Sequence, residues 1–216
     1  VSMLAFYMNV YYVFGGDVKG SAVAFGFVGS SYHVVAIIAS LLFYPWLSRR
    51  VGKKVVFQIA AGLLMAGCLS KLFLYQPGHP WLQLIVIGTN GLSSAGMALM
   101  AGAMLGDIAD LDEWETGNRR EGLFASVLSW FDKAGMSFGA LLGGFVLVWI
   151  GFDAKLGAQS THTLALMKFS YFLAPFVGAL IAFWIIRRYD LDESKAFELK
   201  AALAARRTQA SAGLSP

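Results

Sequence analysis

The chain has 216 residues, of which 57% are hydrophobic and only 14% are charged, and its formal net charge is +4. A soluble globular protein has about 45–50% apolar and roughly 25% charged residues, so this composition excludes an ordinary soluble domain and indicates a membrane protein. The small net charge gives no indication of a nucleic-acid partner, and the single cysteine, Cys68, excludes a disulfide within the chain.

Six apolar segments follow one another, separated by short polar segments. They predict spans at residues 1–14, 22–47, 55–75, 81–106, 122–150 and 164–186. A spanning helix needs about 20 mainly apolar residues, and only the first segment is shorter. Because Val1 already lies in an apolar run, we expect the C-terminal part of a longer protein with a truncated first helix. The predicted fold is an all-α membrane protein, with six transmembrane helices in residues 1–188 and a cytoplasmic tail in residues 189–216.

Lysine and arginine residues gather on one side of these spans, and such an excess marks the cytoplasmic side of a membrane protein. The opposite loops contain only Lys19 and Lys155. The basic side carries Arg49, Arg50, Lys53, Lys54, Arg119, Arg120, Arg187, Arg188, Lys195, Lys200, Arg206 and Arg207. We therefore expect both termini in the cytoplasm. The tail could form a helix from Asp192 to Arg207, and we expect it to be solvated or to rest loosely on the membrane rather than to bind a partner.

The most strongly charged segment between two spans covers residues 107–121. It lacks the alternating ligands and central glycine of a calcium-binding loop. We interpret it as a cytoplasmic loop that forms a gate by pairing with basic residues of a facing domain. The residues assigned to this gate are Asp107, Asp110, Glu113, Arg119, Arg120, Glu121, Arg49 and Arg50.

The fifth predicted span contains a lysine about three turns from its start. An ionisable group at that depth costs at least a few kcal/mol and should face a polar cavity or a partner. Three- and four-residue spacing places one polar stripe on a single helix face, consisting of Ser126, Ser129, Trp130, Lys133 and Ser137. This stripe suits a water-filled pathway. The alternative is a lysine that pairs with a carboxylate for purely structural reasons.

Three further features of the spans have open interpretations. Asp132 points about 100° away from Lys133 and could be a second site carboxylate, a partner for another domain or a neutral buried acid. Asn90 lies in a polar patch that could touch a substrate or form interhelical hydrogen bonds. The four-residue spacing of Gly135, Gly139 and Gly143 predicts close helix packing.

The sequence contains no pattern of a nucleophile elbow, an HExxH zinc site or a phosphate-binding loop. We therefore expect neither an enzyme nor a resident cofactor or metal.

The sequence DIADLDEWETGNRREG at residues 107–122, followed by Ser126 and FDKAG at residues 131–135, resembles the glycoside–pentoside–hexuronide:cation symporters. This family is the melibiose-permease-like branch of the major facilitator superfamily. The RRVGKK segment at residues 49–54 is similar to the superfamily's loop motif, and residues 189–200 are similar to the family's C-terminus. The resemblance covers essentially the whole chain.

The resemblance implies a twelve-helix transporter of which this chain is the second six-helix half. Two such halves rock around a central site, giving alternating access. The coupling cation, Na⁺ or H⁺, and most sugar contacts would then lie in the missing N-terminal half. The lysine that matches Lys133 approaches the cation and sugar site, and the position that matches Ser129 lies beside it. Asp132 departs from the family pattern, which often has an apolar residue there.

The leading hypothesis is therefore cation-coupled symport of a sugar or glycoside across a bacterial inner membrane. Its partners would be the solute, the lipid bilayer and the missing half. Lys133 would supply a charge in the cavity, and Ser129 and Trp130 would line the site. One alternative is an amphiphilic or lysolipid substrate, since some members of the family carry lysolipids. The other is a membrane scaffold without transport.

Overall fold

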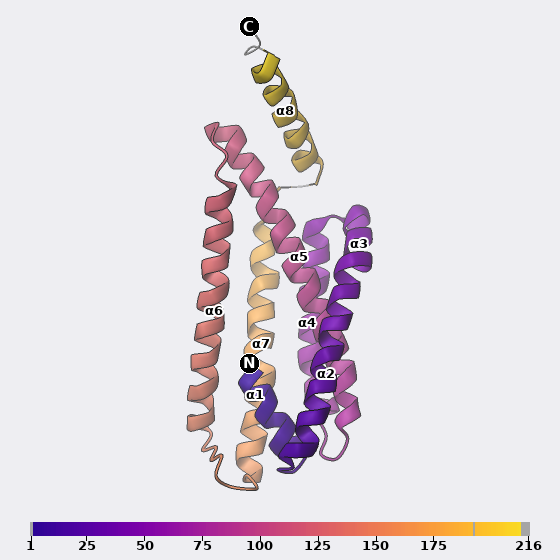
Figure 1. The fold of residues 1–216 in the computed structure, drawn as a ribbon, viewed down its shortest axis with the longest axis vertical. Helices are drawn as coiled ribbons and strands as arrows, with labels where there is room; N and C mark the ends of the chain where they lie inside the picture. The colour runs from indigo at the N-terminus through magenta and orange to yellow at the C-terminus, as the bar shows by residue number, and fades with distance from the viewer. Residues whose placement is uncertain (1, 192, 213–216) are drawn as a thin grey trace.

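The computed structural model describes residues 2–191 and 193–212, and Figure 1 shows them as long helices lying side by side. The described residues form helices and contain no strand. The elements are α1 (Ser2–Tyr7), η1 (Met8–Val13), α2 (Val18–Ile38), η2 (Ala39–Phe43), α3 (Tyr44–Val51), α4 (Lys53–Leu74), η3 (Pro80–Leu82), α5 (Gln83–Thr116), α6 (Glu121–Trp149), α7 (Thr161–Ile185), η4 (Ile186–Arg188) and α8 (Glu193–Ala212).

Five helical segments of the described chain are long and apolar enough to cross a membrane. They cover Val18–Val51, Lys53–Leu74, Pro80–Thr116, Glu121–Trp149 and Thr161–Arg188, and a shorter apolar helix covers Met3–Val13. These segments correspond in order to the six predicted spans and confirm the all-α membrane fold.

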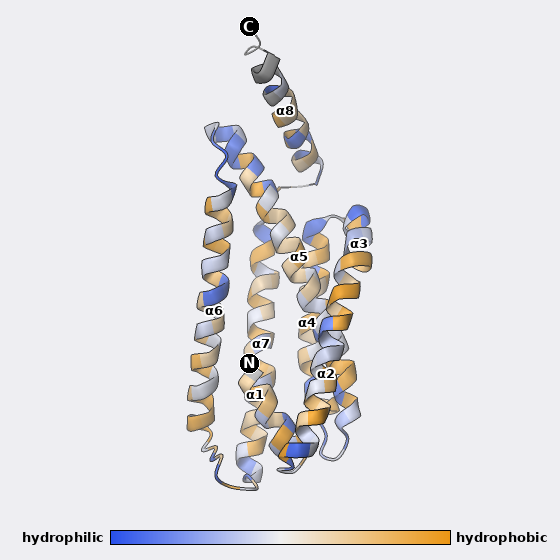
Figure 2. Cartoon of the chain, in the orientation of Figure 1, coloured by the Kyte–Doolittle hydropathy of each residue, from blue (hydrophilic) through white to orange (hydrophobic). Residues whose placement is uncertain are grey.

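The polar residues lie mainly at the two ends of the bundle, with apolar helices between them (Figure 2). The ends of α3, α5 and α7 lie at one end together with α8, and we call this the α8 end (Figure 1). The turns before α2 and α5 and the loop between α6 and α7 lie at the other end, which we call the loop end. Alternate connections therefore lie on opposite sides of the bundle, as a chain that crosses a membrane repeatedly requires.

The predicted loop at residues 107–121 is wrong over most of its length. Helix α5 continues to Thr116, so that Asp107, Asp110 and Glu113 lie on a helix rather than in a loop. The helix ends at Gly117, whose φ of 73° is left-handed and whose N–H donates to the Glu113 carbonyl at 2.9 Å. A glycine in this conformation is the common end of a helix. Only residues 117–120 form the turn before α6.

The helices pack through two buried apolar clusters. The cluster nearer the loop end contains Leu4, Met8, Val13, Tyr75, Val86, Leu147, Ile150, Met167 and Tyr171. The cluster nearer the α8 end contains Ala39, Tyr44, Val56, Ala60, Ala95, Met100 and Met104. Tyr44 is completely buried, and its hydroxyl donates to the Leu92 carbonyl at 2.7 Å, which attaches α3 to α5.

The glycines that bring helices together are not the predicted ones. A Cβ atom at Gly91 would lie 2.7 Å from the Tyr32 carbonyl oxygen, and one at Gly96 would lie 2.4 Å from the Tyr44 ring. A Cβ atom at Gly135, Gly139 or Gly143 would meet no heavy atom within 4 Å. Close packing therefore occurs between α5 and the α2–α3 segment, and the glycines of α6 have open space beside them.

Helix α6 stands apart from the other helices (Figure 1). Leu147, near its loop end, is its one buried residue. Large apolar side chains along its length are exposed, including Trp130, Phe131 and Phe145. The described part of the chain therefore covers very little of the surface of α6.

Candidate functional site

All five residues of the predicted polar stripe lie on α6 and are exposed. The Ser126 hydroxyl donates to the Gly122 carbonyl of its own helix at 2.7 Å, and the Trp130 ring packs edge-on against Phe131. No other described helix covers Ser129, Lys133 or Ser137.

Lys133 lies well inside the spanning segment. It follows Glu121, the first residue of α6, by about 18 Å along the helix axis at ~1.5 Å per residue. Among the described residues it has no hydrogen-bond or ion-pair partner. A charged side chain at this depth is costly against lipid, so protein or water must cover this face of α6 in a membrane.

The structure does not bring the other two predicted site residues to the stripe. Asp132 is exposed on another face of α6 and forms no ion pair with Lys133 or any other described residue. Asn90 faces α4, because a Cβ atom at Gly67 would lie 2.9 Å from its Oδ1 atom. That oxygen is buried and accepts no hydrogen bond from the described residues.

The first gate acid, Asp107, is the centre of a charged cluster at the α8 end. It is only 2% exposed, and it pairs with Lys53 Nζ at 2.5 Å and with Lys200 Nζ at 2.8 Å. Lys200 also lies 3.9 Å from Asp110. We call Lys53, Asp107, Asp110 and Lys200 the Asp107 cluster. It joins three separate elements, α4, α5 and α8.

The other gate residues of this segment pair within the turn between α5 and α6. Arg120 forms an ion pair with Asp112, and Arg119 pairs with Glu121 at 2.6 Å and with Glu113 at 3.7 Å. The hydrogen bond and charge of Asp112 raise the pKa of the Arg120 guanidinium. The arginine of each pair is exposed, so these pairs hold the turn in shape more than they stabilise the bundle.

Arg49 and Arg50, which were assigned to the gate, do not pair with its described acidic residues. Both are exposed at the end of α3, and neither forms an ion pair with a described residue. Lys53 pairs with Asp107 instead, because it is the first residue of α4 and its side chain points toward α5. The neighbouring Lys54 donates from Nζ to the carbonyl oxygens of Arg187 and Tyr189 at 2.9 and 2.7 Å.

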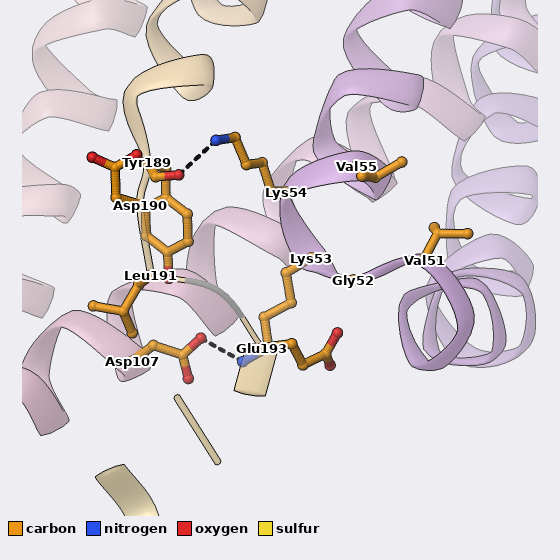
Figure 3. Close-up of a pocket in the computed structure, with 10 residues that line it drawn as sticks. All are labelled: Val51, Gly52, Lys53, Lys54, Val55, Asp107, Tyr189, Asp190, Leu191 and Glu193. Carbon is orange, nitrogen blue, oxygen red and sulfur yellow. Dashed lines mark hydrogen bonds and ion pairs between the residues drawn. The ribbon is translucent and has the colours of Figure 1, made fainter. Parts of the chain in front are cut away.

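A cavity of about 250 Å³ lies between the start of α4 and the segment after α7 (Figure 3). Lys53, Lys54, Asp107, Tyr189, Asp190 and Glu193 line it together with apolar neighbours. Burial of the Tyr189 phenol, with a smaller contribution from the Asp107 charge, raises its pKa to about 12. The hydrogen bond to Asp107 is the main cause that raises the pKa of Lys200.

The tail helix is mostly exposed, as expected of a solvated helix, but one face of it contacts the bundle. Ala196 and Leu203 on α8 are buried, and Lys200 between them reaches Asp107. Its contacts are with the end of α5, which extends beyond the predicted span. Asp192, the predicted start of the tail helix, lies outside the described residues.

Sequence reasoning missed the roles of Lys53, Lys200 and Tyr189. The sequence places Lys53 in a basic loop. In the structure Gly52 separates α3 from α4, so that Lys53 is the first residue of α4. Lys200 occupies the same helix face as Ala196 and Leu203, at spacings of four and three residues. That pattern could have indicated a docked face of α8.

A second basic pair lies in the half of the bundle nearer the loop end. Lys71 is only 3% exposed, and its Nζ lies 4.1 Å from the centre of the Tyr171 ring. Lys168 donates from Nζ to the Tyr12 hydroxyl and the Tyr75 carbonyl, both at 3.2 Å. The described residues supply no carboxylate partner to either lysine.

Comparison with known proteins identifies the family. The MFS/sugar transport protein family matches residues 1–193. An uncharacterized symporter of Bacillus subtilis is 30% identical over 173 residues, which cover 79% of this chain and 36% of that protein. An isoprimeverose transporter of Lactiplantibacillus pentosus is 30% identical over 74% of this chain and 33% of its own length. A glucuronide carrier protein homolog of Escherichia coli is 29% identical over 77% of this chain and 36% of its length.

The chain spans about a third of the length of the curated relatives it matches. These relatives are symporters, carriers and transporters, which confirms that the chain comes from a transporter family and not from an enzyme family. The family match covers the six helical segments of the bundle, the Asp107 cluster apart from Lys200, and the stripe on α6. The chain belongs to the MFS/sugar transport protein family, the sugar:cation symporters of the major facilitator superfamily.

Proposed function

We propose that this chain forms the second half of a twelve-helix symporter that moves a sugar or glycoside together with Na⁺ or H⁺. The observation that carries the proposal is the uncovered polar stripe on α6. A lysine and three serines on one face of a membrane-spanning helix need a polar surrounding, and no described helix provides it. A second helical half with a water-filled space between the halves would provide it.

Lys133 would then lie in the space between the halves and supply a positive charge there. Such a charge can attract acidic groups of the other half or hydroxyl oxygens of a sugar. Ser129, one turn before it, offers a hydroxyl that can both donate and accept hydrogen bonds. The coupling cation would bind mainly in the other half, since the polar stripe of α6 itself contains no carboxylate.

The α8 end would face the cytoplasm, because it carries most of the basic residues. In that orientation the Asp107 cluster lies at the cytoplasmic exit of the bundle. Asp107 and Lys53 hold α5 against α4, while Arg119 and Arg120 shape the turn that leads into α6. We therefore assign this region to the cytoplasmic gate.

The test is solute uptake by the full-length protein in vesicles, using isoprimeverose and a glucuronide as first substrates because relatives are named for them. A sodium or proton gradient should drive accumulation, and Lys133→Ala should reduce it at least about tenfold. The Lys155→Ala variant, which removes an exposed lysine at the loop end, is the control. Unchanged uptake by Lys133→Ala would refute the role of this lysine. Uptake of a lysophospholipid instead of either sugar would favour the amphiphilic substrate.

A further inference from the structure

Four arginines at the α8 end have no acidic partner among the residues that the structure describes, although many acids lie on the same end of the bundle. Arg49 and Arg50 end α3, and Arg187 and Arg188 form most of η4. All four are exposed, and none forms an ion pair with a described residue. In this they differ from Arg119 and Arg120, whose guanidinium groups are already paired with carboxylates.

Two of these arginines are held in the same way on different helices. The Arg50 guanidinium lies 4.6 Å from the centre of the Trp46 ring, and the Arg188 guanidinium lies 4.6 Å from that of Trp184. In each pair the tryptophan comes four residues earlier, one turn closer to the middle of the span. Stacking on a ring leaves the N–H edges of a guanidinium free to bind a phosphate in bidentate fashion.

The two arginine segments are joined through the start of α4. Lys54 donates hydrogen bonds to the carbonyl oxygens of Arg187 and Tyr189, and α4 follows α3 after the single residue Gly52. We call Trp46, Arg49, Arg50, Trp184, Arg187 and Arg188 the arginine–tryptophan rim.

The surface next to the rim is apolar and faces outward. Trp46 and Trp184 are 51% and 55% exposed. Val55 and Ile59 on α4, and Ile181 and Ile185 on α7, are also exposed. Tryptophan is enriched at the level of lipid headgroups, where its ring contacts both the apolar and the polar region. The arginines match the phosphate headgroup of a phospholipid, and the exposed apolar side chains match its acyl chains.

We propose that the arginine–tryptophan rim binds the phosphate headgroups of anionic phospholipids in the leaflet at the α8 end. The stacked guanidiniums hold the phosphate, and the apolar side chains of α4 and α7 contact the acyl chains. Free phosphate would gain nothing from the apolar surface, and a zwitterionic headgroup would present its own cation to the arginines. This inference is independent of the transported solute and of the role of Lys133.

The experiment is native mass spectrometry of the full-length protein, delipidated in a nonionic detergent and titrated with phosphatidylglycerol or with phosphatidylcholine of the same acyl chains. We expect phosphatidylglycerol to bind at least about tenfold more tightly, since each surface arginine contributes substantially to the attraction. The double variant Arg50→Gln/Arg188→Gln should lose this preference. The variant Arg119→Gln/Arg120→Gln removes the same charge from paired arginines at the same end and should retain it.

A third variant, Arg50→Lys/Arg188→Lys, keeps the charges but loses the planar fork and the stacking. It should bind phosphatidylglycerol several-fold more weakly than the unmodified protein, and it replaces the glutamine variant if that variant fails to fold. Equal affinity for the two lipids, equal loss in the Arg119/Arg120 control, or unchanged binding by the lysine variant would each overturn the proposal. Complete competition by millimolar inorganic phosphate would overturn it as well, because the rim would then bind free anions.

Discussion

Asp107 is buried and has two lysine partners, which makes it the most constrained charge at the α8 end. In Asp107→Asn, Lys53, which is only 22% exposed, loses its counter-charge, and Lys200 keeps only Asp110 at 3.9 Å. Removing one member of a buried pair is more costly than removing a surface pair, though the exposure of Lys200 reduces the effect. We expect the variant to lose on the order of 2 kcal/mol of stability.

The measurement is the thermal midpoint of the full-length protein in detergent. Asp112→Asn serves as the control, because it removes an acid whose single ion-pair partner in the described part of the chain is the exposed Arg120 in the adjacent turn. The control should shift the midpoint very little. Equal shifts in the two variants would show that burial of Asp107 has no consequence for stability.

The raised pKa of Tyr189 predicts a loss of folding stability at alkaline pH. Burial raises its pKa to about 12 from the ordinary value of 10.0, and Lys200 shifts in the same direction. Between pH 10 and 12 the folded protein therefore keeps protons that the unfolded chain releases, and stability falls as the pH rises through this range. Tyr189→Phe should match the unmodified protein at pH 8, since the buried hydroxyl has no hydrogen-bond partner among the described residues.

Thermal midpoints measured from pH 8 to pH 11 would test this point. The Tyr189→Phe midpoint should decline less steeply above pH 10 than that of the unmodified protein. Parallel curves over the whole range would contradict the assignment of an alkaline shift to Tyr189.

At the scale of single residues, the sequence allowed the polar stripe of α6 to be predicted but not the partners of Asp107. Ser126, Ser129, Trp130, Lys133 and Ser137 belong to one helix, so their common face follows from helix periodicity alone. Lys53, Asp107 and Lys200 come from three elements far apart in the chain. Their meeting depends on how those elements pack, which no local pattern contains.

At the scale of elements, the packing of α5 rests on two glycines. Gly91→Ala would place a Cβ atom 2.7 Å from the Tyr32 backbone oxygen, which cannot move without shifting α2. Overpacking of this kind typically costs 1–3 kcal/mol, so we expect a loss of about 2 kcal/mol. Gly88→Ala, one turn earlier on α5, meets no atom within 4 Å and should be neutral or slightly stabilising.

Thermal midpoints of the two alanine variants would distinguish these outcomes. A Gly91→Ala midpoint equal to that of Gly88→Ala would mean that α2 and α5 are not in close contact. Retained solute uptake by Gly88→Ala would confirm that the control variant folds.

The elements themselves were predictable to within a few residues where the membrane sets their length. The predicted span at residues 55–75 became Lys53–Leu74, and that at residues 122–150 became Glu121–Trp149. The error at the end of α5 has a physical reason. A cluster of acids is typical of a loop, but a helix can carry acids beyond the membrane when lysines and arginines from other elements pair with them.

At the scale of the whole molecule, the composition and the number of apolar segments were enough to predict an all-α membrane fold. The separation of α6 from the bundle could not be predicted from the sequence. A spanning helix has the same length of apolar sequence whether or not a neighbouring helix covers it. This separation leaves the face of Lys133 open and is the basis of the proposed transport path.

The central claim is that the α6 stripe lines a water-filled path for the solute, and cysteine accessibility tests it most directly. In full-length protein with Cys68→Ser, Ser129→Cys places a thiol on the stripe, and Phe131→Cys places one at similar depth on the far side of α6. Reaction with a membrane-impermeant thiol reagent should be at least about tenfold faster at position 129. Transported sugar should slow the reaction there. Equal rates at both positions, or faster labelling at position 131, would contradict the claim.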